Sequence, residues 1–362
     1  MKHSPLHSQH LARNAKMADF GGWMMPIDYP ETGTLIEHTS VRERVGLFDV
    51  SHLGKASVRG QDATRLLNTA FTNDLDRIQD GQAQYTMMCN PAGGVIDDLI
   101  VYRNSSEDFL LVPNASNTSD VVDGLKALAE PGIEIENLHE KFGVLAIQGP
   151  KSAEVLHALG VDPTLDYMSF SRTMIAGAPV ILCRTGYTGE RGYEILPTWA
   201  ETVTVWEALV DAMRPFDGVV CGLGARDTLR TEMGYPLHGH ELSPVITPVQ
   251  ASANWAVGWN KPFFVGSDLL RKEREAGPTR RMVGLKCLGS GIPRAHMQVK
   301  NKESEIIGEV TSGTFSPTLK NGIALALVSP RYVLGDRLSV DVRGRDCEVE
   351  IVKLPFVPSH VR

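Results

Sequence analysis

The chain has 362 residues, of which 42% are hydrophobic and 22% are charged, and its formal net charge is -7 at pH 7. Because this length exceeds one ordinary hydrophobic core, we expect two or three domains. The acidic balance excludes a global basic field that would hold nucleic acid or an anionic membrane, so neither is an expected partner.

The five cysteines are scattered along the chain and none occurs in CxxC spacing. An odd number of separated cysteines predicts a reducing compartment, with no disulfide framework and no zinc ribbon. The first residues lack the apolar segment of a secretion signal, and no apolar run approaches the length that spans a membrane. These features predict a cytoplasmic protein, although a mature protein of the mitochondrial matrix would have the same features.

Helices and strands alternate through the first 140 residues. Helices are expected over 6–17 and 33–44, followed by an extended segment at 46–53. From residue 55 the expected order is strand, helix (61–69), strand (83–89), strand ending at 102, strand (109–113) and helix (121–128). Short antiparallel-type turns between these strands indicate an α+β layer of the split βαβ kind.

Two adjacent carboxylates occur in this region, in the segment NPAGGVIDDLIVY at 90–102. Gly93 and Gly94 allow a tight turn, and the apolar residues after them predict a short buried strand. Successive side chains of a strand point to opposite faces, so Asp97 and Asp98 cannot face the same way. We expect one to face a cavity and the other a loop or solvent. A turn cap and a functional acid are both open interpretations.

A second alternation of strands and helices is expected from residue 141. Its strands are predicted at 142–148, 170–175, 178–184 and 193–196, and its helices at 151–159 and 203–214. A glycine-rich turn at 185–194 lacks the GxGxxG pattern of dinucleotide-binding loops. The run GLGARDTLR (222–230) then predicts a helix with Arg226 and Arg230 on one face, beginning at a turn where a ligand can meet a helix N-terminus.

His238, His240 and Glu241 lie close enough in sequence to suggest a metal site. Zinc sites add a distant ligand or use HExxH spacing, and neither is visible, so we expect no metal centre. After a charged helix at 267–276, Gly277 and Pro278 mark a boundary. Beyond it, an all-β barrel or sandwich is predicted by short apolar strands at 282–287, 298–300, 306–311, 323–328, 337–342 and 347–353.

Six segments together are similar to one known family. They are FDVSHLG (48–54), NPAGGVIDDLIVY (90–102), GYTGERGYE (186–194), GLGARDTLR (222–230), PRAH (293–296) and TSGTFSPTLK (311–320). In this order, over essentially the whole chain, they resemble the aminomethyltransferase family, the T-proteins of the glycine cleavage system. The resemblance implies a three-domain cloverleaf-like α+β fold, with two α+β domains around a central folate channel and a C-terminal β-barrel domain.

Combined with the expected elements, this resemblance predicts where the domains divide. Residues 1–52 together with 141–277 would form a first, discontinuous α+β domain. Residues 53–140 would form an inserted α+β domain of the split βαβ kind, and residues 278–362 the barrel domain.

The activity that the resemblance implies is one-carbon transfer. The aminomethyl group carried on the lipoyl arm of H-protein would pass to tetrahydrofolate, giving 5,10-methylenetetrahydrofolate, ammonia and dihydrolipoyl H-protein. The implied partners are thus lipoylated H-protein and tetrahydrofolate, with no metal and no flavin.

Family motifs also imply roles for individual residues. Asp98 matches the catalytic carboxylate, which would stabilise iminium-like positive charge and orient or deprotonate a folate amine. Glu194 matches the residue that binds the amino-pyrimidinone edge of the pterin, and Arg226 matches the guanidinium for the anionic glutamate tail. The remaining matches are the channel-lining residues Leu53, Tyr85, Tyr102, Asn114 and Trp255, and Arg294 as a further arginine near the site.

Four positions near the implied site depart from the family or leave a question open. Leu53 stands where methionine is common, Arg191 replaces a frequent acidic residue, and Val361 stands where some relatives have an aromatic near the lipoyl entrance. Whether Arg362 replaces that aromatic contact stays open.

Two alternative functions share the fold. One is a folate-dependent demethylase with another methyl donor. The other is a non-catalytic folate-binding protein that assists iron–sulfur assembly. Relatives of the second kind carry a late cysteine signature and lack the GGxxDD carboxylate, whereas Asp98 is present here.

Overall fold

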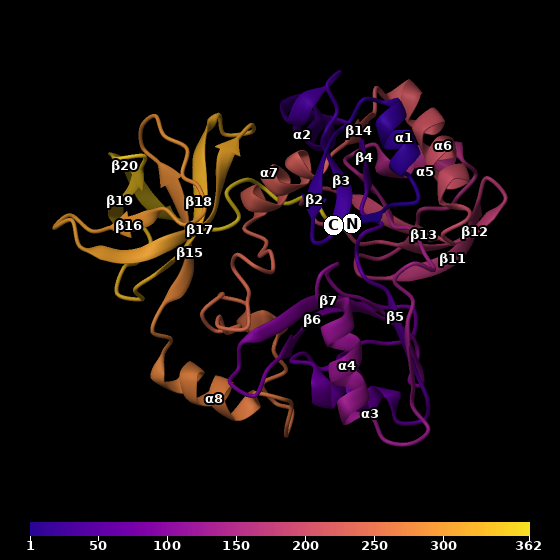
Figure 1. Ribbon diagram of the computed structural model, residues 1–362, viewed down its shortest axis with the longest axis horizontal. Helices are drawn as coiled ribbons and strands as arrows, with labels where there is room; N and C mark the ends of the chain where they lie inside the picture. Colours follow the sequence, from indigo (N-terminus) through magenta and orange to yellow (C-terminus); the bar gives the residue numbers. More distant parts are fainter.

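The structure is a computed structural model that describes residues 1–362. Its strands form a six-stranded sheet, a five-stranded sheet, a closed barrel and a three-stranded N-terminal sheet. Figure 1 shows the barrel on one side of the molecule and the two larger sheets on the other. The α+β class with a C-terminal β-barrel is therefore confirmed.

The six-stranded sheet combines strands from distant parts of the chain. Its order is β11 (Phe170–Ile175), β12 (Ala178–Cys183), β13 (Gly192–Pro197), β10 (Leu145–Gln148), β4 (Gly46–Asp49) and β14 (Val219–Cys221). Alternate residues enter two different cores, with Leu145 and Ile147 in one and Phe48 and Ala146 in the other. Such alternation buries both faces of the sheet.

Helices cover both faces of this sheet. One core contains residues of α5 (Ser152–Ala158) and α6 (Thr202–Met213), among them the fully buried Trp206. The other core contains residues of α2 (Gly33–Glu43) and α7 (Leu223–Met233), among them Val41 and Leu229. Figure 1 shows α5 and α6 on the side of the sheet away from α7.

The five-stranded sheet is antiparallel throughout, as the short turns predicted. Its order is β6 (Ala83–Cys89), β7 (Val95–Ser105), β8 (Asp108–Val112), β5 (Ala56–Arg59) and β9 (Glu134–Asn137). Leu99 and Val101 of β7 pack in a core with residues of α3 (Ala63–Ala70) and α4 (Thr118–Leu128). Tyr102, on the opposite face of β7, joins the core beneath the six-stranded sheet.

The barrel closes in the order β15 (Arg281–Cys287), β18 (Asn321–Val328), β17 (Ile306–Ser316), β16 (Gln298–Lys300), β19 (Arg337–Val342) and β20 (Arg345–Val352). The segment from Leu242 to α8 (Ser267–Ala276) precedes it. Residues of this segment, including Phe264 and Leu270, share a core with Met87 of β6 and Leu325 of the barrel. A segment that the sequence division assigned to the first domain thus packs between the other two.

The first predicted helix is shorter than expected. Helix α1 (His7–Ala12) ends where Asn14 takes a positive φ of 54°, the left-handed conformation that commonly follows a helix. The chain then forms β2 (Lys16–Phe20), which pairs with β3 (Trp23–Asp28). Trp23 and Met25 of β3 are buried, so the apolar pattern reflects one covered face of a hairpin.

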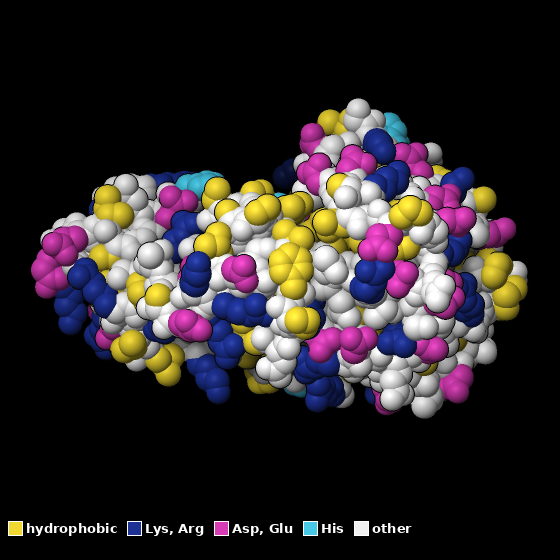
Figure 2. Space-filling view, turned by 90° about the horizontal axis from the view of Figure 1, so that it is seen from below, with side chains coloured by type: hydrophobic (Ala, Val, Ile, Leu, Met, Phe, Trp, Pro, Cys, Tyr) yellow, Lys and Arg dark blue, Asp and Glu magenta, His cyan; other side chains and the backbone are white.

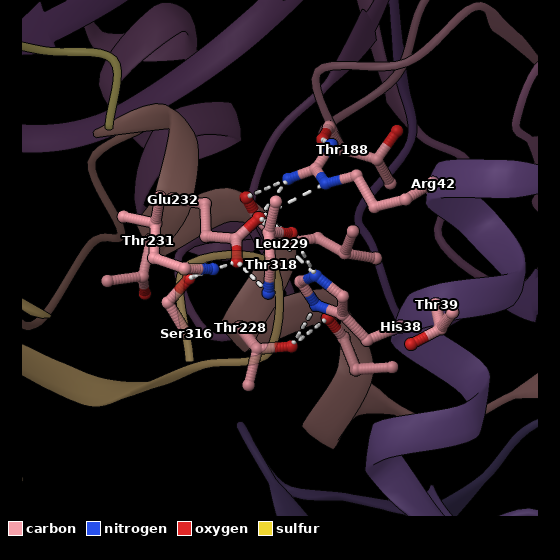
Figure 3. A network of polar contacts seen from close by, with 12 residues as sticks. His38, Thr39, Arg42, Thr188, Thr228, Leu229, Thr231, Glu232, Ser316 and Thr318 are labelled. Carbon is pink, nitrogen blue, oxygen red and sulfur yellow. Dashed lines mark hydrogen bonds and ion pairs between the residues drawn. The ribbon is translucent and has the colours of Figure 1, made fainter. Parts of the chain in front are cut away.

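One carboxylate joins the barrel to the helical layer. Glu232 of α7 accepts hydrogen bonds from Arg42 Nη2 (2.8 Å) of α2 and from Ser316 Oγ (2.5 Å) and Thr318 Oγ1 (2.9 Å) of the barrel. His38 Nε2 lies 3.3 Å from the same carboxylate. Figure 3 shows these side chains converging on Glu232 from α2 and from the barrel.

On the face seen from below, acidic and basic side chains are interspersed, so this face is neither mainly positive nor mainly negative (Figure 2). No helix combines the length and apolar composition that crossing a bilayer requires.

Candidate functional site

Asp98 lies on the face of β7 that looks toward the six-stranded sheet. Its Oδ2 accepts a hydrogen bond from the Tyr85 hydroxyl (3.0 Å), and its Oδ1 accepts one from Asn114 Nδ2 (2.9 Å). Tyr85 reaches it because Asp98 pairs with Met87 on β6, two residues further along that strand. The carboxylate is thus held by two donors from neighbouring segments.

The surroundings of Asp98 favour its protonated form more than water does. Burial raises the pKa of Asp98, and the hydrogen bond from Tyr85 opposes that shift. Burial and the nearby Asp98 carboxylate together raise the pKa of Tyr85, which keeps the phenol protonated as a donor. A carboxyl group with a raised pKa suits proton exchange near neutral pH.

Asp97 faces the loop at 113–117 that leads into α4, in keeping with the expectation that one of the two carboxylates faces a loop. It is fully buried and accepts hydrogen bonds from Asn114 N (2.9 Å), Asn114 Nδ2 (2.9 Å) and Asn117 Nδ2 (2.7 Å). Strand alternation thus places the two carboxylates on opposite faces of β7, and α4 with the residues leading into it covers the face that Asp97 occupies.

An aromatic surface lies beside Asp98. The Tyr85 ring stacks on Trp255, with centroids 5.1 Å apart and planes inclined by 28°. Trp255 belongs to the short helix η3 (Asn254–Ala256) and is 65% exposed, so most of its ring surface is available to a ligand. An exposed ring backed by a second, stacked ring suits a flat heterocycle or a benzoyl group.

Hydrogen bonds connect Glu194 to Thr185, and Thr185 to Tyr102. The Thr185 hydroxyl donates to Glu194 Oε2 (2.6 Å), and the Tyr102 hydroxyl lies 3.1 Å from Thr185 Oγ1. Tyr102 is almost fully buried and packs edge-on against Phe170. Oε1 of Glu194 takes part in none of these bonds, so the carboxylate keeps acceptor capacity for another donor pair.

Arg226 is a half-buried cation with an unused donor. Its guanidinium lies 4.6 Å from the centroid of the Tyr187 ring, and its Nη1 has no hydrogen-bond partner. Burial lowers the pKa of Arg226, while Glu194 and Tyr187 oppose that shift. A planar donor in this state suits an acceptor or anionic group of a ligand.

Two groups of α7 that the sequence offered to a ligand, the N–H of its N-cap Gly222 and the guanidinium of Arg230, have partners within the chain. Gly222 N donates to Glu37 Oε2 (2.9 Å), and the Gly222 backbone packs against Ile27 of β3. Arg230 is occupied by Asp227, Glu241 and Ser312 in a buried set of bonds.

The remaining predicted residues have separate environments. Leu53 is half-buried against the core that contains Tyr102. The side-chain amide of Asn114 is occupied by the two aspartates. Arg294 is exposed on the barrel and donates to Gly313 O (3.1 Å), away from the contacts that join the other candidates.

The three residues that suggested a metal site have different partners. His238 contacts Asn117 Nδ2 and Val95 O, His240 contacts Thr311 O, and Glu241 bonds Arg230. No group of three His, Cys, Asp or Glu side chains is arranged to hold a metal ion.

The C-terminal tail returns to the glycine-rich turn. His360 N donates to Gly189 O (2.7 Å), Arg184 Nη2 donates to Val361 O (2.7 Å), and the Arg362 guanidinium lies 6.0 Å from the Tyr167 ring centroid. The only aromatic contact of Arg362 in this structure is therefore with Tyr167.

Sequence reasoning missed Thr185, Tyr187 and Asn117. Thr185 and Tyr187 belong to the glycine-rich turn at 185–194, whose family motif pointed to Glu194 but gave no signal for these two neighbours. Asn117 carried no signal, because its link to Asp97 depends on where α4 begins.

Comparison with known families defines the class of protein. A family model described as the GCVT N-terminal domain matches residues 6–261, and one described as the glycine cleavage T-protein C-terminal barrel domain matches residues 280–358. The fold and the site therefore define a two-part T-protein architecture, with Asp98 and its neighbours in the first part.

Relatives match the chain over its full length. A protein named aminomethyltransferase from Parafrankia sp. (strain EAN1pec) is 53% identical over 100% of this chain and 99% of its own. One of the same name from Mycobacterium tuberculosis (strain ATCC 25618 / H37Rv) is 52% identical over 99% and 98%. The crystal structure of glycine cleavage system aminomethyltransferase T from Bartonella henselae has a TM-score of 0.93 at 33% identity, covering 99% of both chains.

The chain belongs to the aminomethyltransferase family, the T-proteins of the glycine cleavage system. The resemblance that the six sequence segments indicated is thus confirmed, and the chain is a transferase.

Proposed function

We propose that this chain transfers the aminomethyl carbon from the dihydrolipoyl arm of H-protein to tetrahydrofolate. The products are 5,10-methylenetetrahydrofolate, ammonia and dihydrolipoyl H-protein. The observation that carries the proposal is Asp98, a carboxyl group with a raised pKa beside Tyr85 and the exposed Trp255 ring stacked on it, in a chain of this family.

The chemistry of the surrounding side chains fits a folate. The free acceptor capacity of Glu194 suits the donors on the amino-pyrimidinone edge of a pterin. The unpaired Nη1 of Arg226 suits the carboxylates of the glutamate tail. Tyr85 and Trp255 offer ring surface, and we assign Leu53, Tyr102 and Asn114 to the channel wall. Arg294 lies exposed on the barrel, where it donates to Gly313 O.

The reaction breaks two bonds to the transferred carbon and forms two. Its bonds to the lipoyl sulfur and to the amine nitrogen break, and bonds to two folate nitrogens replace them. The two protons lost by the folate nitrogens go to the thiol and the ammonia. Asp98 would stabilise the cationic carbon as each leaving group departs and would accept a proton from a folate amine.

Ammonia release provides the direct test of this function. Aminomethylated H-protein is mixed with the chain, with and without tetrahydrofolate, and ammonia is measured. We expect release that depends on tetrahydrofolate. Tight folate binding without release would favour the demethylase or the iron–sulfur assembly factor.

Trp255→Ala should raise the KM for tetrahydrofolate about 2- to 10-fold, because the change removes the ring on which an aromatic part of the folate would stack. Trp255→Phe keeps a ring against Tyr85 and should stay near the wild-type value. Steady-state kinetics with varied tetrahydrofolate would measure both. Equal KM values for wild type and Trp255→Ala would remove Trp255 from the folate site.

Docking of H-protein offers a further prediction. Because the chain is itself acidic, an acidic partner requires a local basic contact, and we propose that Arg191 contributes one. Arg191 is exposed at the edge of a hollow of about 490 Å³ that also contains Asp80 and Asp166. Reversing its charge would leave that edge acidic.

Arg191→Glu should therefore raise the KM for H-protein about 2- to 5-fold, more at low salt than at high salt. The matched control is Arg214→Glu, an exposed arginine paired with Asp211. An unchanged KM in Arg191→Glu, or an equal rise in both variants, would contradict a specific role for Arg191.

We also propose a cytoplasmic location. All five cysteines are free and buried in the structure, which accords with a reducing compartment.

A further inference from the structure

Trp255 belongs to an element that is too short to fix the position of its ring. The helix η3 has three residues, and the Trp255 side chain is mostly exposed. Its ring nevertheless stacks on Tyr85 of β6, which belongs to the five-stranded sheet. A single 3₁₀ turn forms few internal hydrogen bonds. Contacts from elsewhere in the chain are therefore needed to hold the ring over Tyr85.

Thr72 connects η3 to β6. The residue is fully buried, and its hydroxyl donates to Ala256 O (2.9 Å) and accepts a hydrogen bond from Met87 N (3.2 Å). The backbone N of Thr72 donates to Met87 O (2.8 Å), and its carbonyl accepts a hydrogen bond from Gly258 N (2.8 Å). Both hydrogen-bonding functions of the hydroxyl and both backbone groups are thus used to join the two elements.

Lys261 strengthens the same connection. Its Nζ donates to three backbone carbonyls, those of Asn68 (2.7 Å), Phe71 (2.6 Å) and Asn73 (2.8 Å). Burial lowers the pKa of Lys261 to about 8, so the ammonium group is mostly charged at pH 7 and has one donor for each carbonyl. Asn73 Nδ2 in turn donates to Tyr85 O (2.9 Å).

Residues 71–73 therefore form a bridge between the two aromatic rings of the candidate site. On one side the bridge is hydrogen-bonded to β6, which carries Tyr85, and on the other it is hydrogen-bonded to residues 256–261, which follow Trp255. A ring that is already held in place binds a flat ligand without the entropic cost of ordering its loop.

We propose that Thr72 and Lys261 are positioning residues for the folate acceptor, because their hydrogen bonds hold the Trp255 ring in its stack over Tyr85. Both residues are buried, so they act through Trp255 and do not touch the folate. The inference rests on the proposed function for the identity of the ligand. The geometry of the stack is a property of the chain alone.

The first test observes the Trp255 ring in the full-length protein without a ligand. The protein is labelled with fluorotryptophan, and the fluorine resonance of Trp255 is the one of five that Trp255→Phe removes. Thr72→Val keeps the volume of the side chain but leaves Ala256 O without its donor. We therefore expect the Trp255 resonance to shift or broaden in this variant. Thr72→Ser keeps the hydroxyl and should retain the wild-type resonance.

The second test measures the Kd for tetrahydrofolate by calorimetry. Thr72→Val should raise the Kd about 2- to 10-fold, the range expected when one aromatic stacking contact is lost. Lys261→Met removes the three charge-assisted bonds and should change the Kd in the same direction. The kcat of Thr72→Val at saturating tetrahydrofolate should change little, because Asp98 keeps its own two donors.

A double-mutant cycle separates positioning from a general loss of stability. In the Trp255→Ala background the ring is absent, so Thr72→Val should raise the Kd no further. Thr202→Val is the matched control, because Thr202 at the start of α6 is fully buried and its hydroxyl donates to Thr198 O (2.9 Å). It should lower the Tm, as Thr72→Val does, and leave the Kd unchanged.

Three outcomes would overturn the inference. They are an unchanged Trp255 resonance in Thr72→Val, a wild-type Kd in that variant, and additive effects of Thr72→Val and Trp255→Ala on the Kd. If Lys261→Met does not fold, Thr72→Val decides the question alone. If the wild type releases no ammonia, the proposed function fails, whereas the resonance of the free protein still decides whether the bridge holds the ring.

Discussion

Asp98→Asn is expected to lower kcat for tetrahydrofolate-dependent ammonia release by about 10²- to 10⁴-fold, the range that a positioned acid–base group contributes. The asparagine keeps the shape of the side chain and a partner for Tyr85, but it carries no charge and takes up no proton. Stabilisation of the cationic carbon and proton removal from the folate amine would both be lost. Single-turnover ammonia release with saturating tetrahydrofolate measures the effect.

Two controls separate chemistry from binding and folding. The Kd for tetrahydrofolate and the Tm of Asp98→Asn should stay close to the wild type, because the side chain is replaced by one of equal size. Asp108→Asn on β8 changes a partly exposed carboxylate paired with Arg59 and should retain the rate. A wild-type rate in Asp98→Asn, or a loss explained by weaker folate binding, would remove Asp98 from the chemistry.

Glu232→Ala is expected to lower the free energy of unfolding by about 3 to 5 kcal/mol, because it removes the partner of a buried cation. Glu232 is fully buried, and its loss leaves part of Arg42 without a counter-charge and His38 without a neighbouring acceptor where α2, α7 and the barrel meet (Figure 3). Urea denaturation would measure the change. Glu130→Ala breaks an exposed pair with Arg65 and should have little effect.

The contribution of Glu232 should depend on pH in a defined window. Burial alone would raise its pKa, but His38, Arg42 and Ser316 outweigh burial and hold the pKa at about 2. A carboxylate with a lowered pKa stabilises the fold above its ordinary pKa, and this stabilisation is lost as pH falls toward the folded value. The difference in stability between wild type and Glu232→Gln should shrink between pH 4.5 and pH 2. A constant difference across that window would assign the effect to packing.

The candidate site was partly visible in the sequence. Asp98 stood out because two carboxylates follow a glycine turn at the start of a strand, and its contact with Tyr85 follows from strand pairing. The link from Glu194 through Thr185 to Tyr102 was not visible, since it joins β13, a turn and β7. The contact of Arg226 with Tyr187 likewise depends on how the glycine-rich turn packs on α7.

The sequence by itself determined the local elements and the family. Hydrophobic periodicity and turn residues act over a few positions, so they located α2, β6 and α6 within one residue and the barrel strands within five. Six ordered motifs identified the T-protein family. Only the tertiary structure decided which polar side chains are buried and which have hydrogen-bond partners. Asp97 is buried because α4 and the residues before it cover it. Arg230 is hydrogen-bonded to Glu241, whereas Nη1 of Arg226 has no partner. Glu232 accepts a hydrogen bond from Thr318, a barrel residue 86 positions away. Burial and hydrogen-bond partners arise from contacts between distant segments, which local patterns do not encode.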